Sequence, residues 1–407
     1  MNPKPQGKYW RSLLLVIFAL GGAIIAISAA LGILVFVRLN TSALVQLNSS
    51  PLTGILTAST LTAIGLLLLP IAWLSLKRLR GGDFDSLVLP PLHIWEWIVI
   101  PGLWVIVLTL ATLYHDSAGA YRYVPFLHFI SISLPIYFVV RIATNRIPLG
   151  SSQRAWGVFS VGMTLSPLMA VIAEFLVIFL GILVAGIYLG FNPGKMAEIE
   201  RLVKLANQTH NIDTLLRQAG PLLTNPLTLL VGLSFLSFFI PIIEETAKST
   251  GVWLVSGWLR SPAQGFALGV LSGAGFALAE SLTASLTADS SWAATLGVRA
   301  ISGSMHMLAT GVFGWGIAYA RLEKRYLRLF GMMLVAMFLH SAWNAGAVLS
   351  VWGGVRTMLA MPGFDFLGTA SVVSGVGLLF FMMAAMILAF FILNARLRTP
   401  APPAPNE

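Results

Sequence analysis

Ten long apolar stretches follow one another through this chain of 407 residues. A helix that crosses the hydrocarbon core of a bilayer needs about 20 apolar residues, and each stretch is about that long or longer. We predict spans at about 12–37, 52–76, 92–114, 124–142, 158–190, 226–259, 262–288, 297–320, 327–350 and 366–394. Charged residues make up only 10% of the chain, against roughly 25% in soluble proteins. The predicted fold is therefore all-α, a polytopic bundle of about ten transmembrane helices.

The basic residues of the predicted connections orient this bundle. Sixteen lie in alternating connections on one side: Lys4, Lys8, Arg11, Lys77, Arg78, Arg80, Arg141, Arg146, Arg154, Arg260, Arg321, Lys324, Arg325, Arg328, Arg396 and Arg398. The four short connections of the opposite side hold four: Arg38, Arg122, Arg299 and Arg356. Since cytoplasmic connections are enriched in Lys and Arg, both termini are predicted to be cytoplasmic in a multi-pass protein of the cell membrane. The same bias accounts for the net charge of +10, so lipid and not nucleic acid is the expected partner.

The chain is predicted to have four regions. Residues 1–157 form about four N-terminal spans, and 158–225 hold the fifth span and a longer outer loop. Apolar residues recur through that loop at helical spacing, from Ile199 to Leu205, which predicts an amphipathic helix at the membrane surface. Residues 226–350 form four spans that contain most of the intramembrane polar groups. Residues 351–407 hold the last span and a Pro-rich, disordered C-terminal tail.

Two adjacent carboxylates, Glu244 and Glu245, lie inside the sixth predicted span, with Lys248 one turn later. An ionisable group inside a bilayer costs at least about 2.5–3.5 kcal/mol, so such groups usually have a function. Two carboxylates and one lysine leave a negative charge in excess, which favours proton exchange. Pro241 precedes the pair and is expected to kink the helix and free backbone polar groups near it.

The next three spans also carry polar groups. These are Glu280 after Phe276 in the seventh, His306 before Thr310 in the eighth, and His340 before Asn344 in the ninth. At about 1.5 Å per residue, the polar groups of all four spans lie roughly 18–30 Å from the cytoplasmic edge. A single Glu–Lys pair or a single buried His is more often structural. Four helices that present such groups at one depth favour a hydrolytic site. The chain has no cysteine, which excludes a thiolate nucleophile or ligand.

These motifs resemble those of the PrsW family of intramembrane proteases and, more distantly, the CAAX prenyl endopeptidases. The resemblance covers about residues 235–350, in the order Glu-Glu-x-x-Lys, Phe-x-x-x-Glu, His and His-x-x-x-Asn. It implies an endopeptidase that cuts a single-span membrane protein such as an anti-sigma factor. By this resemblance Glu244 or Glu245 activates the attacking water and Asn344 polarises the scissile carbonyl. The residues that complete or support the site would be Glu280, His306, His340, Lys248, Phe276 and Thr310.

Two questions stay open at the level of sequence. A Zn²⁺ ion on His306, His340 and Glu280 is one possibility, since two histidines and a carboxylate suffice for a zinc site. The chain has no His-Glu-x-x-His motif, and the prenyl endopeptidases resemble metal-independent glutamate enzymes, so direct activation of water is the other. A proton-coupled transporter and a non-catalytic scaffold that uses the polar cluster for packing are the alternative functions.

Overall fold

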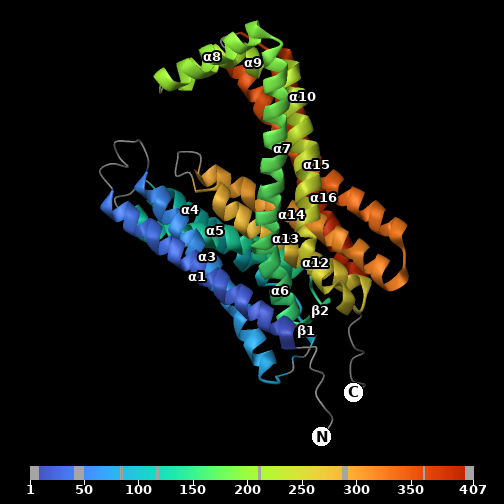
Figure 1. The fold of residues 1–407 in the computed structure, drawn as a ribbon. Coiled ribbons are helices and arrows are strands. Elements are labelled where there is room, and N and C mark those ends of the chain that lie inside the picture. Colours follow the sequence, from blue (N-terminus) through green and yellow to red (C-terminus); the bar gives the residue numbers. More distant parts are fainter. Residues whose placement is uncertain are drawn as a thin grey trace. The chain divides into compact units, whose positions relative to one another are not determined.

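A computed structural model describes residues 9–40, 50–82, 84, 86–115, 119–209, 212–286, 292–360 and 363–398. Nearly all of them are helical (Figure 1). The long helices are α1 (Tyr9–Leu39), α3 (Pro51–Leu79), α4 (Glu96–His115), α5 (Ala120–Ala143), α7 (Leu165–Gly190), α13 (Pro262–Ala284), α14 (Trp292–Glu323), α15 (Tyr326–Ala360) and α16 (Phe366–Leu397). The shorter ones are α6 (Ser152–Met163), α8 (Pro193–Gln208), α9 (Ile212–Leu223), α10 (Pro226–Ser234), the π-helix η2 (Phe235–Phe239), α11 (Ile240–Lys248), α12 (Thr250–Val255) and the 3₁₀ turn η3 (Ser256–Trp258).

Nine helical segments among the described residues are long and apolar enough to cross a membrane. The segments Ser152–Gly190 and Pro226–Trp258 each combine several of the helices named above. The eighth predicted span, 297–320, corresponds to α14, a helix of 32 residues that is not among these nine. The prediction of a polytopic helical membrane protein is thus confirmed. The C-terminal tail lies outside the described residues, and the orientation of the termini stays a prediction.

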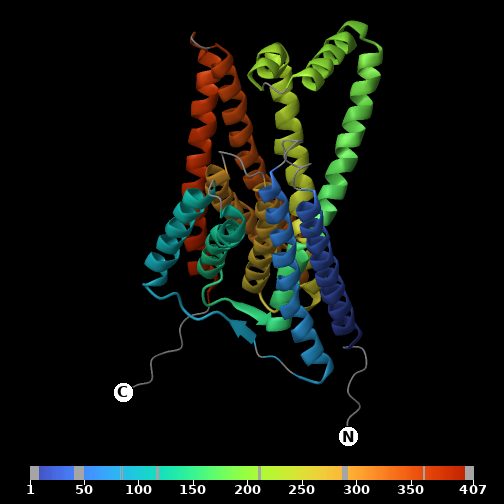
Figure 2. The same cartoon turned by 90° about the vertical axis from the view of Figure 1, so that its left-hand side faces the viewer.

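A small two-stranded sheet is a regular element that the sequence did not predict. Strand β1 (Ser86–Val88) pairs antiparallel with β2 (Pro148–Ser151), with Ser86 opposite Ser151 and Val88 opposite Pro148. The two arrows in Figure 2 mark this sheet. Three residues are too few for an alternation of polar and apolar side chains to be recognised in the sequence.

The described chain divides into two compact units. The first consists of Met1–Pro167, Lys248–Ala336 and Met386–Glu407. Its centre is α13, where Gly265, Gly269 and Gly273 face α14 so closely that a Cβ on any of them would overlap the α14 backbone. On another face, Gly275 lies as close to the backbone of α6. Small residues four apart, such as Gly265, Gly269 and Gly273, allow this approach of membrane helices.

The second unit consists of Leu168–Ala247 and Met337–Ala385. Here α15 and α16 approach closely at Gly353, where a Cβ would lie 2.6 Å from the carbonyl oxygen of Gly368, and at Gly375 against Gly346. The predicted helix of the outer loop is present as α8, and none of its residues is buried. Its place at the membrane surface stays a prediction. Four helices, α7, α11, α15 and α16, continue from one unit into the other.

Candidate active site

The predicted site residues fall into two groups, one in each unit. The second-unit group consists of Glu244, Glu245, His340 and Asn344. The first-unit group consists of Lys248, Glu280 and His306, together with Arg299, which the sequence analysis assigned to an outer connection. Phe276 and Thr310 also lie in the first unit. Each group is described within its own unit.

The sixth predicted span is interrupted by η2, immediately before α11. The backbone N–H of Ile240 donates to the carbonyl of Phe235, five residues earlier, which is the π-helical register. In that register the donor to the next carbonyl, Leu236 O, would be residue 241. That residue is Pro241, which has no N–H, so the carbonyl needs another donor. The side-chain amide of Asn344 supplies it, with Nδ2 2.7 Å from Leu236 O.

Asn344 therefore attaches α15 to the turn that begins α11, and Pro241 frees a backbone group as the sequence suggested. The role first expected for Asn344, polarising a substrate carbonyl, would require Nδ2 to leave Leu236 O. In this structure Asn344 positions the segment that carries the two glutamates.

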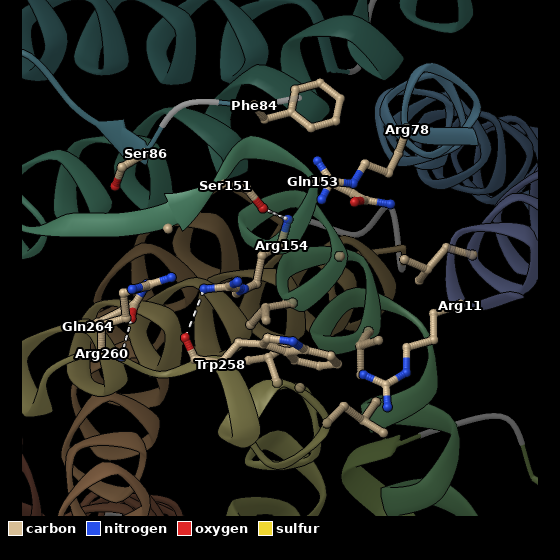
Figure 3. A pocket seen from close by; sticks show the side chains of 18 of the residues that line it. Arg11, Arg78, Phe84, Ser86, Ser151, Gln153, Arg154, Trp258, Arg260 and Gln264 are labelled. Atoms are coloured by element: carbon tan, nitrogen blue, oxygen red, sulfur yellow. Dashed lines mark hydrogen bonds between the residues drawn. The ribbon is translucent and has the colours of Figure 1, made fainter. Parts of the chain in front are cut away.

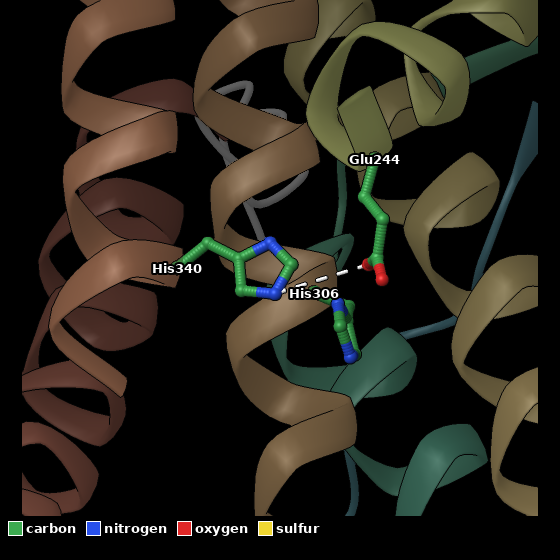
Figure 4. Close-up of side chains that lie close together, drawn as sticks. All are labelled: Glu244, His306 and His340. Atoms are coloured by element: carbon green, nitrogen blue, oxygen red, sulfur yellow. Dashed lines mark ion pairs between the residues drawn. The ribbon is translucent and has the colours of Figure 1, made fainter. Parts of the chain in front are cut away.

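His340 lies between the two carboxylates of α11. Its Nδ1 is 2.9 Å from Glu245 Oε1, and its Nε2 is 3.8 Å from Glu244 Oε2, the contact dashed in Figure 4. The exposed fractions of Glu244, Glu245 and His340 are 8%, 0% and 2%. A carboxylate only accepts hydrogen bonds, so Nδ1 donates to Glu245. Nε2 of the neutral ring is then an acceptor directed toward Glu244.

This arrangement suits a divalent metal. A histidine that binds a metal through one ring nitrogen usually donates the other to a carboxylate, as His340 does to Glu245. Zn–N and Zn–O distances of about 2.0–2.2 Å sum to slightly more than the 3.8 Å between His340 Nε2 and Glu244 Oε2. One ion can therefore contact both atoms, and so can one water molecule that donates a hydrogen bond to each of them.

His306, the third residue labelled in Figure 4, belongs to the first unit and has partners there on both ring nitrogens. Lys248 Nζ is 2.6 Å from Nδ1, and Glu280 Oε2 is 2.8 Å from Nε2. An ammonium group has only donors, so Nδ1 accepts from Lys248 and Nε2 donates to Glu280. Lys248 is fully buried and His306 is 2% exposed. The contacts thus form a buried chain of polar groups from lysine through imidazole to carboxylate.

Arg299 is the residue of this group that the sequence analysis missed. Its Nη2 lies 2.6 Å from Glu280 Oε2, the oxygen that also faces His306. Helix α14 begins at Trp292, five residues before the predicted span, so Arg299 is helical and lies two turns before His306. A spacing of seven residues puts both on one face, and that spacing was the available signal.

Phe276 and Thr310, the two predicted supporting residues, have different positions. The Phe276 ring lies beneath the Lys248 ammonium, whose Nζ is 4.3 Å from the ring centroid. The centroids of the Phe276 and His306 rings are 5.6 Å apart. This cation–π contact helps to hold a buried lysine. Thr310 is fully buried one turn after His306, where the close approach of Gly269 brings α13 against its backbone.

Comparison with known families identifies the chain. The model of the PrsW family, described as a family of intramembrane metalloproteases, matches residues 153–382, more than half of the chain. The chain belongs to this family. Comparisons with curated proteins and with solved structures gave no match.

The PrsW match extends well beyond the resemblance read from the motifs. It includes all residues of both groups, and it also includes nearly all of α6, α7, the loop with α8 and α9, and about half of α16. Helices α1, α3, α4 and α5 precede it. The PrsW region thus contains both groups of site residues, while the first four long helices lie outside it.

Proposed function

We propose that this PrsW protein is an intramembrane endopeptidase that hydrolyses a peptide bond of a single-span membrane protein through an activated water. The observation that supports this most is the buried trio in which Glu245 orients His340 and His340 faces Glu244. Peptide hydrolysis needs a base for water, an acid for the leaving amine and donors for the developing oxyanion. The two groups contain residues for each of these tasks.

In this proposal Glu244 is the base. It is the less buried of the two glutamates and takes a proton from water, while Glu245 holds the His340 ring in one tautomer. His340 then stabilises the proton transfer, as a histidine oriented by a carboxylate does in other hydrolases.

The first-unit group would serve the carbonyl and the leaving amine. Lys248 and Arg299 carry positive charge that can stabilise an oxyanion, and His306 can pass a proton to the departing nitrogen. The chain itself supports joint action of the groups. Glu244 and Lys248 lie four residues apart on the single helix α11, and therefore one helical turn from each other.

If a metal takes part, we propose Glu244 and His340 of the second unit as its ligands, because one ion can contact both facing atoms; Glu244 then binds the metal instead of acting as the base. The set first considered, His306, His340 and Glu280, stays a prediction. Glu280 already accepts from Arg299 and His306, which favours Glu244 in its place. A metal held there would supply Lewis-acid polarisation of the scissile carbonyl.

The test uses the full-length protein in liposomes with a single-span reporter substrate. We expect cleavage by the wild type, and a loss of about 10²–10⁴-fold in Glu244→Gln and His340→Ala. Glu200→Gln, which alters an exposed carboxylate of α8, is the matched control and should keep full activity. Metal content measured by mass spectrometry should fall in both site variants and not in the control.

Two results would count against the proposal. Full cleavage by both site variants would remove these residues from the mechanism. A wild type that never cleaves, with variants that differ only in thermal stability, would favour the scaffold alternative. Anti-sigma factors are a further proposal about the substrate, supported by the resemblance alone. A panel of single-span reporters would test it.

A further inference from the structure

A cavity of about 1010 Å³ lies within the first unit, apart from both groups of site residues. Its walls come from α1, α3, the β1–β2 sheet, α6, α12 and η3, and from the start of α13 (Figure 3). Ligand pockets commonly have volumes of about 300–1,000 Å³, so the cavity is large enough for an organic molecule. None of the catalytic residues proposed above lines it.

Four arginines from four separate segments line the cavity: Arg11, Arg78, Arg154 and Arg260. Among the residues that the structure describes, no Asp or Glu lines it; Asp83 and Asp85 lie outside those residues. Guanidinium groups brought to one cavity repel each other, and a bound anion would offset that repulsion. Arginine binds phosphate through two parallel hydrogen bonds, which makes phosphate the anion best suited to such a set.

Arg154 is held in place by the surrounding backbone. Its Nη1 donates to the carbonyl of Trp258, 3.1 Å away. Gly150, at φ +80°, allows this arrangement, since a Cβ there would lie 2.8 Å from Arg154 Nη1 and 2.6 Å from Gln264 Nε2. The Arg11 guanidinium in turn lies over the indole of Trp258, with Cζ 4.5 Å from the ring centroid. Two of the four cations are thus ordered by one tryptophan.

The rest of the lining is partly polar and partly apolar. Gln153 donates to Ser12 Oγ at 3.1 Å, which connects α6 to α1 at the edge of the cavity. Apolar side chains such as Leu15, Val158 and Leu254 cover other parts of the wall. A small inorganic ion would leave these apolar walls in contact with water. A molecule with a phosphate at one end and a hydrocarbon chain would cover them.

The predicted position of the four arginines along the membrane normal also favours a lipid ligand. All four arginines belong to the basic connections that the charge bias assigns to the cytoplasmic face. Basic pockets between membrane helices on that face bind anionic lipid headgroups. We propose that this cavity binds a phosphate-bearing anion, and that the apolar lining favours an anionic phospholipid as its source.

The experiment measures ligand binding, so it is independent of proteolysis. Full-length protein in phosphatidylcholine nanodiscs is titrated with a spin-labelled phosphatidylglycerol, and the Kd is read from the immobilised fraction. We expect Arg11→Gln/Arg154→Gln to weaken binding at least about 10-fold. Arg154→Lys keeps the charge but loses the planar fork, and should weaken binding by less. Arg38→Gln/Arg122→Gln removes two basic residues that do not line the cavity, and should bind like the wild type.

Parallel titrations with inorganic phosphate and with a nucleoside triphosphate distinguish the sources. Saturable binding of either that the Arg11→Gln/Arg154→Gln change weakens would assign the cavity to a soluble phosphate compound. If all three ligands bind the wild type and this double variant with equal affinity, the proposal is wrong. Arg11→Gln alone, on an exposed side chain, serves as the variant least able to disturb the fold.

Discussion

Two buried acidic sites in this protein show how differently carboxylates can be used inside a membrane helix bundle. In the first unit, Glu96 and Arg141 form a bidentate pair, with Nε–Oε2 and Nη2–Oε1 distances of 3.1 and 2.9 Å. Both residues are only 4% exposed, and Arg141 donates further to the carbonyl of Pro90. One positive and one negative charge cancel, and the pair connects α4 to α5.

In the second unit, two carboxylates, Glu244 and Glu245, contact one imidazole, that of His340. Burial is similar at the two sites, so burial alone does not distinguish structural from reactive groups. The partners differ: a guanidinium holds one carboxylate at the first site, whereas an imidazole, a common proton-transfer group, contacts two at the second. The Glu96–Arg141 pair is expected to contribute stability, and the trio to contribute chemistry.

The largest expected effect is that of Glu245→Gln on cleavage. The amide keeps the shape of the side chain but cannot hold the Nδ1–H of His340 as a carboxylate does. We expect kcat to fall about 10²–10⁴-fold, and metal affinity to fall about 10–100-fold, with the helical content unchanged. Reporter cleavage, metal titration and circular dichroism measure the three quantities.

The matched control for that variant is Glu96→Gln, the same chemical change at the balanced site. It should lower thermal stability but leave cleavage per folded molecule within about twofold of the wild type. If Glu96→Gln abolished cleavage as fully as Glu245→Gln, the distinction between the two sites would fail.

The second prediction concerns Arg141→Met, which leaves the Glu96 carboxylate buried without its guanidinium. Removing one partner of a buried ion pair typically costs about 3–5 kcal/mol of unfolding free energy. We expect a loss of that size in denaturant unfolding in mild detergent. The double variant Glu96→Gln/Arg141→Met should recover much of it, because no buried charge is then left over. A double variant less stable than Arg141→Met would contradict this account.

The sequence predicted the spans and the helices that hold the site residues, because hydropathy and helical spacing are local properties. His340 and Asn344 lie one turn apart on α15, and Glu280 lies one turn after Phe276 on α13, as their spacing required. The partners of these residues could not be predicted in the same way. Whether Lys248 pairs with Glu244 or contacts His306 depends on how separate helices pack, which spacing within one helix does not determine.

Arg299 and η2 illustrate two other limits of prediction from the sequence. Arg299 was counted with the basic residues of the outer connections, although α14 extends seven residues before it and its charge faces Glu280. The π-helical turn at Phe235–Phe239 lies in a mostly apolar sequence with no signal of its own. Only Pro241, five residues after Leu236, marks the carbonyl that Asn344 satisfies.

The third prediction tests what Asn344 does. Asn344→Ala leaves Leu236 O without its side-chain donor, which should cost about 1–3 kcal/mol of stability and reduce cleavage as α11 shifts. Pro241→Ala would provide a backbone N–H in the π-helical register of the same carbonyl. We therefore expect Pro241→Ala/Asn344→Ala to regain stability and cleavage relative to Asn344→Ala. Recovery of stability without any recovery of cleavage would instead assign Asn344 to the substrate carbonyl.

The smallest expected effect belongs to a second arginine–carboxylate pair, which is balanced like Glu96–Arg141 but partly exposed. Arg356 Nε lies 2.7 Å from Asp365 Oδ2 in the connection between α15 and α16, with side-chain exposures of 22% and 16%. The hydrogen bond from Arg356 lowers the pKa of Asp365 below its usual value of 3.8. A lowered pKa in the folded state means that the pair contributes stability above pH 3.8, and that this contribution is lost as the pH falls through the lowered pKa.

Asp365→Asn should accordingly lower the melting temperature slightly at pH 7 and not at all at pH 2.5. Solvent screens exposed pairs, so the change should be smaller than that of Arg141→Met. Melting curves of the wild type and the variant from pH 7 to pH 2.5 measure it, and the two curves should converge as the pH falls. A difference that is constant over this range would mean that Asp365 acts by capping α16, where its Oδ1 accepts from the N–H of Leu367 at 3.1 Å, and not through its charge. Charge balance would then explain stability only at the buried pair of Glu96 and Arg141.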